Sequence, residues 1–145
     1  MVDVRTEIVI YCPRGKAAAY TTDPDHAPEW YANIRSAEWR TLKPLQVGSR
    51  IAFKARFLGR DLAYVYEVID FVPSEKLVMR TADGPFPMET TYEWADTDDG
   101  ATRMTLRNRG EPGGFFKLFV PMLAAAMRKA NQKDLQKAKQ ILESR

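Results

Sequence analysis

Apolar and polar residues alternate through most of the chain, and this period of two is typical of β-strands that bury one face. The alternation predicts seven strands, which are separated by turns rich in Gly, Pro and Asp. The predicted strands span residues 4–11, 37–42, 49–57, 60–72, 76–82, 87–95 and 101–109. Two short helices are expected between the first two strands, at 13–23 and 27–32, with Asp25 as the N-cap of the second.

A helical period replaces the alternation after Gly113. Apolar residues there recur every three or four positions, as they do on one face of an α-helix. The resulting seam consists of Phe116, Val120, Ala124, Met127, Asn131, Leu135, Ala138 and Leu142. Its ends are bulky and its middle, around Ala124, is small, so we expect a cavity where this helix packs against a curved sheet. Pro121 is expected to kink the helix or to mark the start of its regular part.

The turn at 96–100 joins two strands that are expected to pair as a hairpin. Pairing them symmetrically about the centre of the turn places Glu93 opposite Arg103 and Glu89 opposite Arg107, and a bulge in the turn would shift this pairing by one residue. The charged side chains then define the outer face. The inner face consists of Met88, Thr90, Tyr92, Trp94, Met104, Leu106 and Asn108.

The third and fourth predicted strands add aromatic residues to the same side of the sheet. In the third strand, Phe53 and Phe57 face inward because basic residues occupy alternate positions. The fourth strand can be placed either way round, since both of its faces carry apolar residues. We favour the orientation with Tyr64 and Tyr66 inward, because it exposes Glu67 to water.

Composition limits the classes of protein to which the chain can belong. With 145 residues, 45% of them hydrophobic, it is expected to form one domain over residues 1–145. The single cysteine, Cys12, excludes an internal disulfide and fits a reducing compartment. The N-terminus lacks the pattern of a signal peptide, and no apolar run is long enough to span a bilayer. We therefore expect a cytoplasmic protein without integral membrane association.

The charge pattern argues against a nucleic-acid partner. The net charge is only +3, and 22 basic residues are interleaved with 19 acidic ones. Basic residues crowd the last helix, but Asp134 and Glu143 lie among them, which predicts a solvated helix face. His26 has acidic neighbours but no second imidazole, and the turn at 96–100 departs from the calcium-loop pattern. We expect neither a metal nor a cofactor.

The order of the predicted elements is one strand, two short helices, six strands and a long helix. With this order, the sequence resembles the START-like (SRPBCC) helix-grip superfamily, particularly its polyketide cyclase/dehydrase branch. The resemblance is carried by Trp30 before the second strand, Val47-Gly48-Ser49, the run from Tyr66 to Leu77, and the ending from Asp134 to Glu143. It implies an α+β fold in which a seven-stranded antiparallel sheet curls around the long C-terminal helix, with an apolar ligand cavity between them.

Members of this superfamily bind lipids, sterols, quinones, plant hormones or polyketides, and a related branch serves as co-chaperone domains. The resemblance therefore implies a small hydrophobic partner, such as a lipid, a quinone or an aromatic, polyketide-like molecule. Aromatic side chains and Met with few polar groups are the usual lining of a ligand pocket, although the same residues can also fill a core. The predicted ligand-binding residues are Phe53, Phe57, Tyr64, Tyr66, Met88, Thr90, Tyr92, Trp94, Met104, Asn108, Phe116, Val120, Ala124, Met127 and Asn131.

Catalysis in the same cavity is the alternative to simple binding, because some members of the superfamily catalyse cyclisation or dehydration. Such a reaction needs a base that removes a proton and a donor that stabilises the enolate. Tyr64 and Tyr66 can donate, but a base would have to come from Glu67, Asp70 or a loop. This shortage favours a binding protein over a polyketide cyclase or dehydratase. A co-chaperone-like interaction module predicts an exposed apolar patch, against which the evenly charged outer strand faces argue.

Overall fold

The computed structural model describes the side chains of residues 1–113 and 117–145. Its elements follow the predicted order. They are β1 (Val2–Ile10), α1 (Arg14–Thr22), the 3-10 helix η1 (Pro24–His26), α2 (Ala27–Trp30), β2 (Ile34–Trp39), β3 (Arg50–Phe57), β4 (Arg60–Val72), β5 (Lys76–Asp83), β6 (Met88–Asp96), β7 (Thr102–Gly110), the 3-10 helix η2 (Gly114–Phe119) and α3 (Val120–Glu143). Six of the seven predicted strands agree with these bounds to within two residues.

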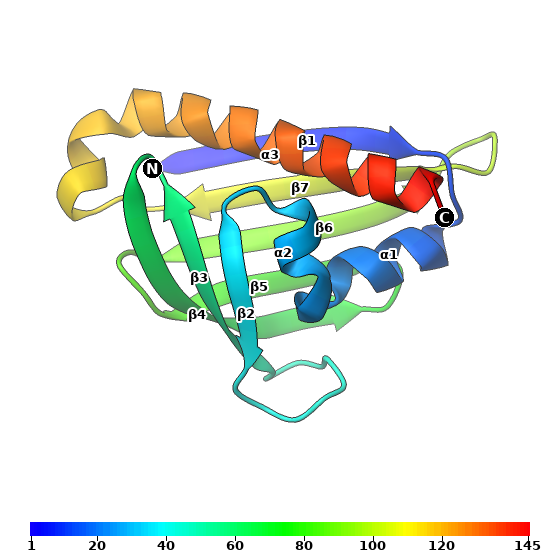
Figure 1. Cartoon of the computed structure of the whole chain (residues 1–145), viewed down its shortest axis with the longest axis horizontal. Helices are drawn as coiled ribbons and strands as arrows, with labels where there is room; N and C mark the ends of the chain where they lie inside the picture. Colours follow the sequence, from blue (N-terminus) through cyan, green and yellow to red (C-terminus); the bar gives the residue numbers. More distant parts are fainter.

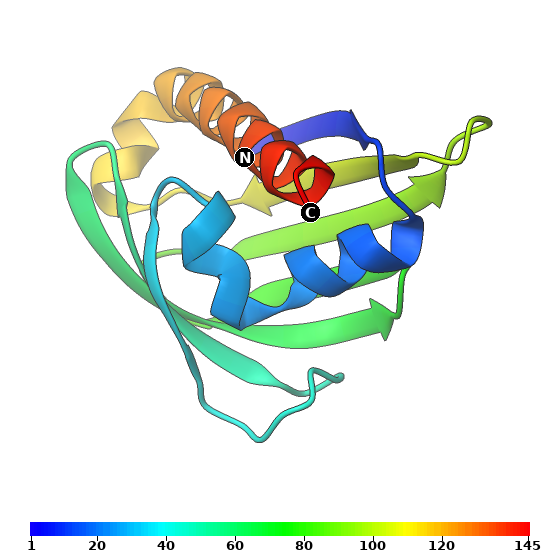
Figure 2. The ribbon, with the colours of Figure 1, turned by 45° about the vertical axis from the view of Figure 1, so that its right-hand side comes forward.

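The seven strands form one antiparallel sheet in the order β1-β7-β6-β5-β4-β3-β2. Figure 1 shows this sheet curving beneath α3, and the turned view in Figure 2 shows it wrapping around the helices. The long helix α3 packs along β1 and contacts α2, while α1 lies against β6. This arrangement confirms the α+β helix-grip fold that the resemblance implied.

Two expectations around the second strand are wrong. The strand β2 begins three residues earlier than predicted, because the buried Ile34 extends its pairing with β3. The N-cap position of α2 is His26, which makes no side-chain capping hydrogen bond, and Asp23 caps the preceding η1, where its carboxylate accepts the backbone N–H of Asp25 at 2.9 Å. The carboxylate of Asp25 accepts instead from the side chains of Trp39 at 3.0 Å and Lys43 at 2.7 Å. Asp25 therefore ties η1 to the end of β2.

The β6–β7 hairpin is offset by two residues from the predicted register. Glu93 lies opposite Thr105, and Glu89 lies opposite Arg109, so neither faces the arginine that symmetric pairing suggested. The cause is the turn, a three-residue loop whose last residue, Gly100, has a φ of +80°. Because the offset is even, every side chain remains on its predicted face of the sheet.

The helix α3 buries a stripe that differs from the predicted seam at its N-terminal end. Val120 and Ala124 are half-buried, and they pack with Val2 and Val4 in a small apolar cluster. The alanine-rich middle of the helix therefore does not create the cavity. Pro121 lies in the first turn and marks the start of the regular helix, as expected. The buried residues of α3 are Leu123, Met127, Asn131, Asp134, Leu135, Ala138 and Leu142.

Candidate ligand-binding site

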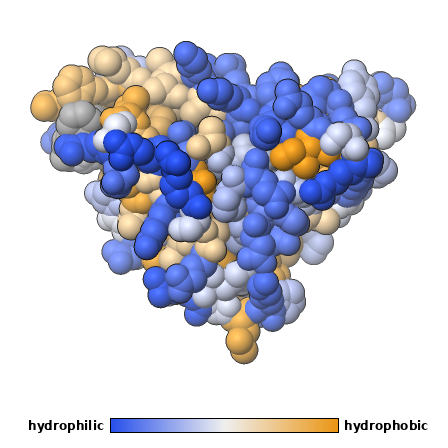
Figure 3. Space-filling view, viewed as in Figure 1, coloured by the Kyte–Doolittle hydropathy of each residue, from blue (hydrophilic) through white to orange (hydrophobic). Residues whose placement is uncertain are grey.

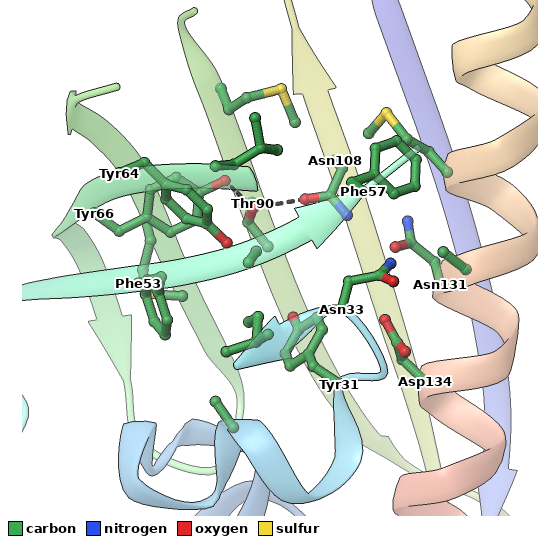
Figure 4. A pocket seen from close by; sticks show the side chains of 18 of the residues that line it. Tyr31, Asn33, Phe53, Phe57, Tyr64, Tyr66, Thr90, Asn108, Asn131 and Asp134 are labelled. Atoms are coloured by element: carbon green, nitrogen blue, oxygen red, sulfur yellow. Dashed lines mark hydrogen bonds between the residues drawn. The ribbon is translucent and has the colours of Figure 1, made fainter. Parts of the chain in front are cut away.

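A cavity of about 170 Å³ lies between the inner face of the sheet and α3, and residues of the α1–α2 segment form part of its wall. Three aromatic rings of β3 and β4, those of Phe53, Tyr64 and Tyr66, have centroids 5.0, 5.5 and 6.0 Å apart and form one side of it (Figure 4). The predicted ligand-binding residues that line the cavity are Phe53, Phe57, Tyr64, Tyr66, Met88, Thr90, Tyr92, Asn108, Met127 and Asn131. Their contact with a ligand stays a prediction.

Other residues predicted for the site lie elsewhere. Trp94 is covered by α1, and its indole N–H donates to the hydroxyl of Thr21 at 3.2 Å. Met104 is fully buried in the filled part of the core. Val120 and Ala124 belong to the small cluster on β1 described above, and Phe116 lies outside the described residues. Alternation reveals which face of the sheet a residue occupies, but not which part of that face a helix covers.

Neither candidate base of β4 reaches the cavity. Glu67 lies on the outer face, where its carboxylate is 2.8 Å from the guanidinium of Arg50. Asp70 follows an irregularity in the β4–β5 pairing and lies 3.5 Å from Lys76. The prediction that Tyr64 faces inward is correct, and the alternation of side chains along a strand then directs Glu67 outward.

A buried carboxylate on the cavity wall comes from α3 instead. Asp134 is 2% exposed, and its Oδ1 accepts the backbone N–H of Ala32 at 2.9 Å. Burial raises the pKa of Asp134 to about 6, although the Ala32 hydrogen bond and the charge of Lys133 act in the opposite direction. The expectation that Asp134 belongs to a solvated face is therefore wrong. Its spacing, three residues after Asn131 and four before Ala138, is the signal that places it on the buried stripe.

Hydrogen bonds link several polar groups across the sheet. The Thr90 hydroxyl donates to Asn108 Oδ1 at 2.6 Å, so it accepts from the Tyr66 hydroxyl at 2.9 Å. Tyr31, which the sequence patterns did not reveal, shares a short hydroxyl–hydroxyl hydrogen bond with Tyr92. Burial raises the pKa of Tyr66 to about 12 and holds those of Tyr31 and Tyr92 well above their usual range. These tyrosines therefore remain protonated and act as O–H donors at neutral pH.

Asn131 is the second polar residue that α3 contributes to the wall. Its side chain is 6% exposed, and its Nδ2 has no hydrogen-bond partner among the described residues. Figure 4 shows Asn131 and Asp134 extending from α3 to the same side, toward Asn33. A buried amide without a partner costs about 1–3 kcal/mol. This part of the cavity wall is therefore polar, and its hydrogen-bonding groups are not all paired.

The cavity wall carries negative charge only. Among the described residues that line it, the carboxylates are those of Asp23 and Asp134, and there is no lysine, arginine or histidine. An anionic group of a ligand would meet no counter-charge there. Across the part of the chain that the structure describes, His, Cys, Asp and Glu side chains form no group suited to a metal ion.

Exposed apolar side chains gather at the start of α3. Leu118, Phe119 and Met122 are 81%, 40% and 67% exposed. Figure 3 shows hydrophobic surface at the corresponding corner of the molecule, at the upper left. Such a patch was not expected from the evenly charged strand faces, because it lies on η2 and α3 rather than on the sheet. None of the helices in the described ranges has the length and apolar character needed to cross a membrane.

A curled antiparallel sheet that grips a long C-terminal helix around a cavity defines a protein of the START-like helix-grip class. The sequence profile of one family, described as "Polyketide cyclase / dehydrase and lipid transport", matches residues 1–143. The chain belongs to this family. A search of curated protein sequences finds no significant match.

Solved structures with a similar fold come from several bacteria. The protein TTHA0849 from Thermus thermophilus is 16% identical, with a TM-score of 0.85 and coverage of 98% of this chain and 97% of that one. The ZhuI aromatase/cyclase from Streptomyces sp. R1128 is 14% identical, with a TM-score of 0.80 and coverage of 97% and 93%. A START superfamily protein from Mycobacterium smegmatis is 12% identical, with a TM-score of 0.81 and coverage of 98% and 97%. At these identities the likeness concerns the fold alone.

Proposed function

We propose that the protein binds a small hydrophobic molecule with an aromatic body in the cavity between the sheet and α3. The observation that supports this proposal is the cavity itself, with a volume of about 170 Å³ and a wall made mainly of aromatic and aliphatic side chains. An engineered protein cavity of about 150 Å³ holds a benzene molecule. The cavity therefore suits one ring with a short substituent, or one end of a longer molecule.

The alternative, that the same residues merely fill a core, is less consistent with this volume. Protein interiors contain few voids larger than a water molecule. A volume of about 170 Å³ is roughly tenfold larger than the volume of about 10–15 Å³ that a cavity needs to hold one water. The family description, which names cyclases and lipid transport, also favours a small-molecule ligand. We retain the expectation that the protein acts in the cytoplasm, with which its unpaired Cys12 is consistent.

Binding of propylbenzene, measured by isothermal titration calorimetry, tests this proposal. Ala55 lies on the cavity wall, and the substitution Ala55→Leu adds three carbon atoms to the space that the ring would occupy. We expect this variant to bind more than about tenfold more weakly than the wild type. Ala52→Leu is the matched control, because Ala52 lies on the same strand and faces the other side of the sheet. Equal binding of propylbenzene to both variants, or failure of the wild type to bind either propylbenzene or its phenol analogue 4-propylphenol, would contradict the proposal.

Catalysis is a second candidate function, because Asp134 gives the cavity a carboxylate. A carboxyl with a pKa of about 6 is suited to removing a proton next to a carbonyl at neutral pH. The hydroxyl of Tyr64 lies on the same wall and can donate a hydrogen bond to the enolate oxygen. The similarity in fold to an aromatase/cyclase is in keeping with this candidate.

Exchange of the α-protons of 4-phenylbutan-2-one for deuterium, followed by NMR in D2O, tests the catalytic candidate. If Asp134 is the base, the wild type accelerates exchange over buffer and Asp134→Asn abolishes the acceleration. Tyr64→Phe is expected to lower the rate by at least about tenfold, since it removes a donor to the enolate. A wild-type rate equal to that of buffer would exclude this activity toward the probe.

A further inference from the structure

Two polar side chains of α3 meet the cavity with incomplete hydrogen bonding. Asn131 and Asp134 are 6% and 2% exposed, and both line the cavity. Asn131 Nδ2 donates to no partner among the described residues. Asp134 uses Oδ1 to accept the N–H of Ala32, whereas its Oδ2 accepts no hydrogen bond from the residues with described side chains. These two side chains of α3 therefore offer the cavity an unused donor and an unused acceptor.

The spacing of these two residues allows one ligand atom to reach both. Side chains three residues apart on a helix have Cβ atoms about 5–6 Å from each other. One oxygen atom can bridge such a pair, because each hydrogen bond spans about 2.7–3.0 Å. Figure 4 shows Asn131 and Asp134 extending from α3 to the same side, as this bridge requires.

The chemistry of the pair distinguishes among polar groups that a hydrophobic ligand can carry. A carboxylate or phosphate would face Asp134 with no basic residue among the described lining residues to compensate. A ketone or quinone oxygen only accepts, so it would pair with Asn131 and leave Asp134 unpaired. An ammonium group only donates, so it would pair with Asp134 and leave Asn131 unpaired. A hydroxyl group both donates and accepts, so it satisfies both side chains.

We propose that the ligand carries a hydroxyl group on its aromatic body, and that this hydroxyl donates to Asp134 Oδ2 and accepts from Asn131 Nδ2. This inference rests on the proposed function, because it requires that the cavity binds a small hydrophobic molecule. A phenol is the simplest ligand of this class. Asp134 and Asn131 then determine specificity, while the aromatic and aliphatic wall supplies most of the contact area.

Four probes of similar size separate these possibilities by calorimetry at pH 8. They are 4-propylphenol, 4-propylanisole, propylbenzene and 3-phenylpropylamine. We expect 4-propylphenol to bind the wild type at least about tenfold more tightly than each of the other three, since a hydrogen bond to a charged group changes affinity by about this factor or more. The anisole has the same oxygen without its proton, so it isolates the contribution of donation to Asp134.

Two variants assign the preference to the two side chains. Asp134→Asn retains an oxygen for Ala32 and replaces Oδ2 with a donor, so the preference for 4-propylphenol over 4-propylanisole is expected to fall below about threefold. Asn131→Leu is expected to weaken 4-propylphenol relative to propylbenzene without lowering Tm, because it removes an unpaired buried amide. A purely structural Asn131 would instead lower Tm and leave the probe preference unchanged. Asp98→Asn, in the exposed β6–β7 turn, is the charge-matched control.

The possible outcomes separate this inference from the proposed function. Equal affinities of the phenol, the anisole and propylbenzene would overturn the hydroxyl assignment and leave the proposed function intact. Tighter binding of 3-phenylpropylamine than of 4-propylphenol would overturn it in favour of an ammonium ligand. Failure of all four probes to bind the wild type would overturn the proposed function as well.

Discussion

Asp134 is the residue at which burial and charge conflict most directly. Its carboxylate lies on a mainly apolar wall, where ionisation costs free energy. The N–H of Ala32 offsets only part of that cost, since the pKa of Asp134 is still raised to about 6. Strongly shifted titratable groups in a cavity are typical of functional sites. Asp134 is therefore a stronger candidate for a functional residue than its place among the lysines of α3 suggests.

The raised pKa of Asp134 makes a prediction about stability. The pKa of Asp134 in the folded protein, about 6, lies above the ordinary value of 3.8. Between pH 3.8 and pH 6, the folded state therefore binds more protons than the unfolded state. The contribution of the Asp134 carboxyl to the free energy of unfolding is therefore greatest below pH 3.8, and it is lost as the pH rises through 6. From about pH 5 to pH 8, we expect the wild type to lose about 1–2 kcal/mol relative to Asp134→Asn, as measured by urea unfolding.

The exposed Asp98 again provides the control for this measurement. Asp98→Asn alters the same charge in the β6–β7 turn, far from the cavity wall, so its stability is expected to follow that of the wild type across this pH range. If the wild type and Asp134→Asn change in parallel, the carboxyl of Asp134 is solvated and has no raised pKa.

At the scale of strands, the alternation of side chains predicted the faces of the sheet, whereas the pairing of charges did not predict the register. The sequence predicted the inner face of the β6–β7 hairpin correctly, although the register is offset by two residues. Side chains repeat with a period of two, so an even offset changes partners but not faces. The partners depend on the turn, where Gly100 adopts a positive φ, and exposed charge pairs are too weak to dictate the register.

At the scale of the long helix, the predicted seam is wrong only at its N-terminal end, where Leu123 rather than Val120 and Ala124 is buried. A helical apolar stripe is wide enough to contain two neighbouring lines, one through Leu123 and one through Ala124. Packing of α3 on β1 selects the line through Leu123 and places Asp134 on the same buried stripe. A hydropathy pattern assigns a charged residue to the solvent-exposed face of a helix. Only the spacing of Asp134 from its buried neighbours indicates that its side chain lies on the buried face.

At the scale of the whole molecule, the order of elements was predictable and the extent of the cavity was not. Tyr31 and Asn33 reach the wall from the segment between α2 and β2, where no periodic pattern marks a buried side. Trp94 shares its face of the sheet with Tyr92 but is covered by α1. A cavity arises where the helices do not fill the curve of the sheet, and this mismatch depends on three-dimensional packing rather than on local sequence.

NMR of the methionine methyl groups tests binding in the cavity most directly. Of the six methionines, Met79, Met88 and Met127 line the cavity, whereas Met104 lies in the filled core and Met122 is exposed at the start of α3. Titration with propylbenzene is expected to shift the three cavity signals along one saturable curve and to leave the Met122 signal unchanged. Absence of saturable shifts at all three, or a largest shift at Met122, would contradict binding of a hydrophobic molecule in this cavity.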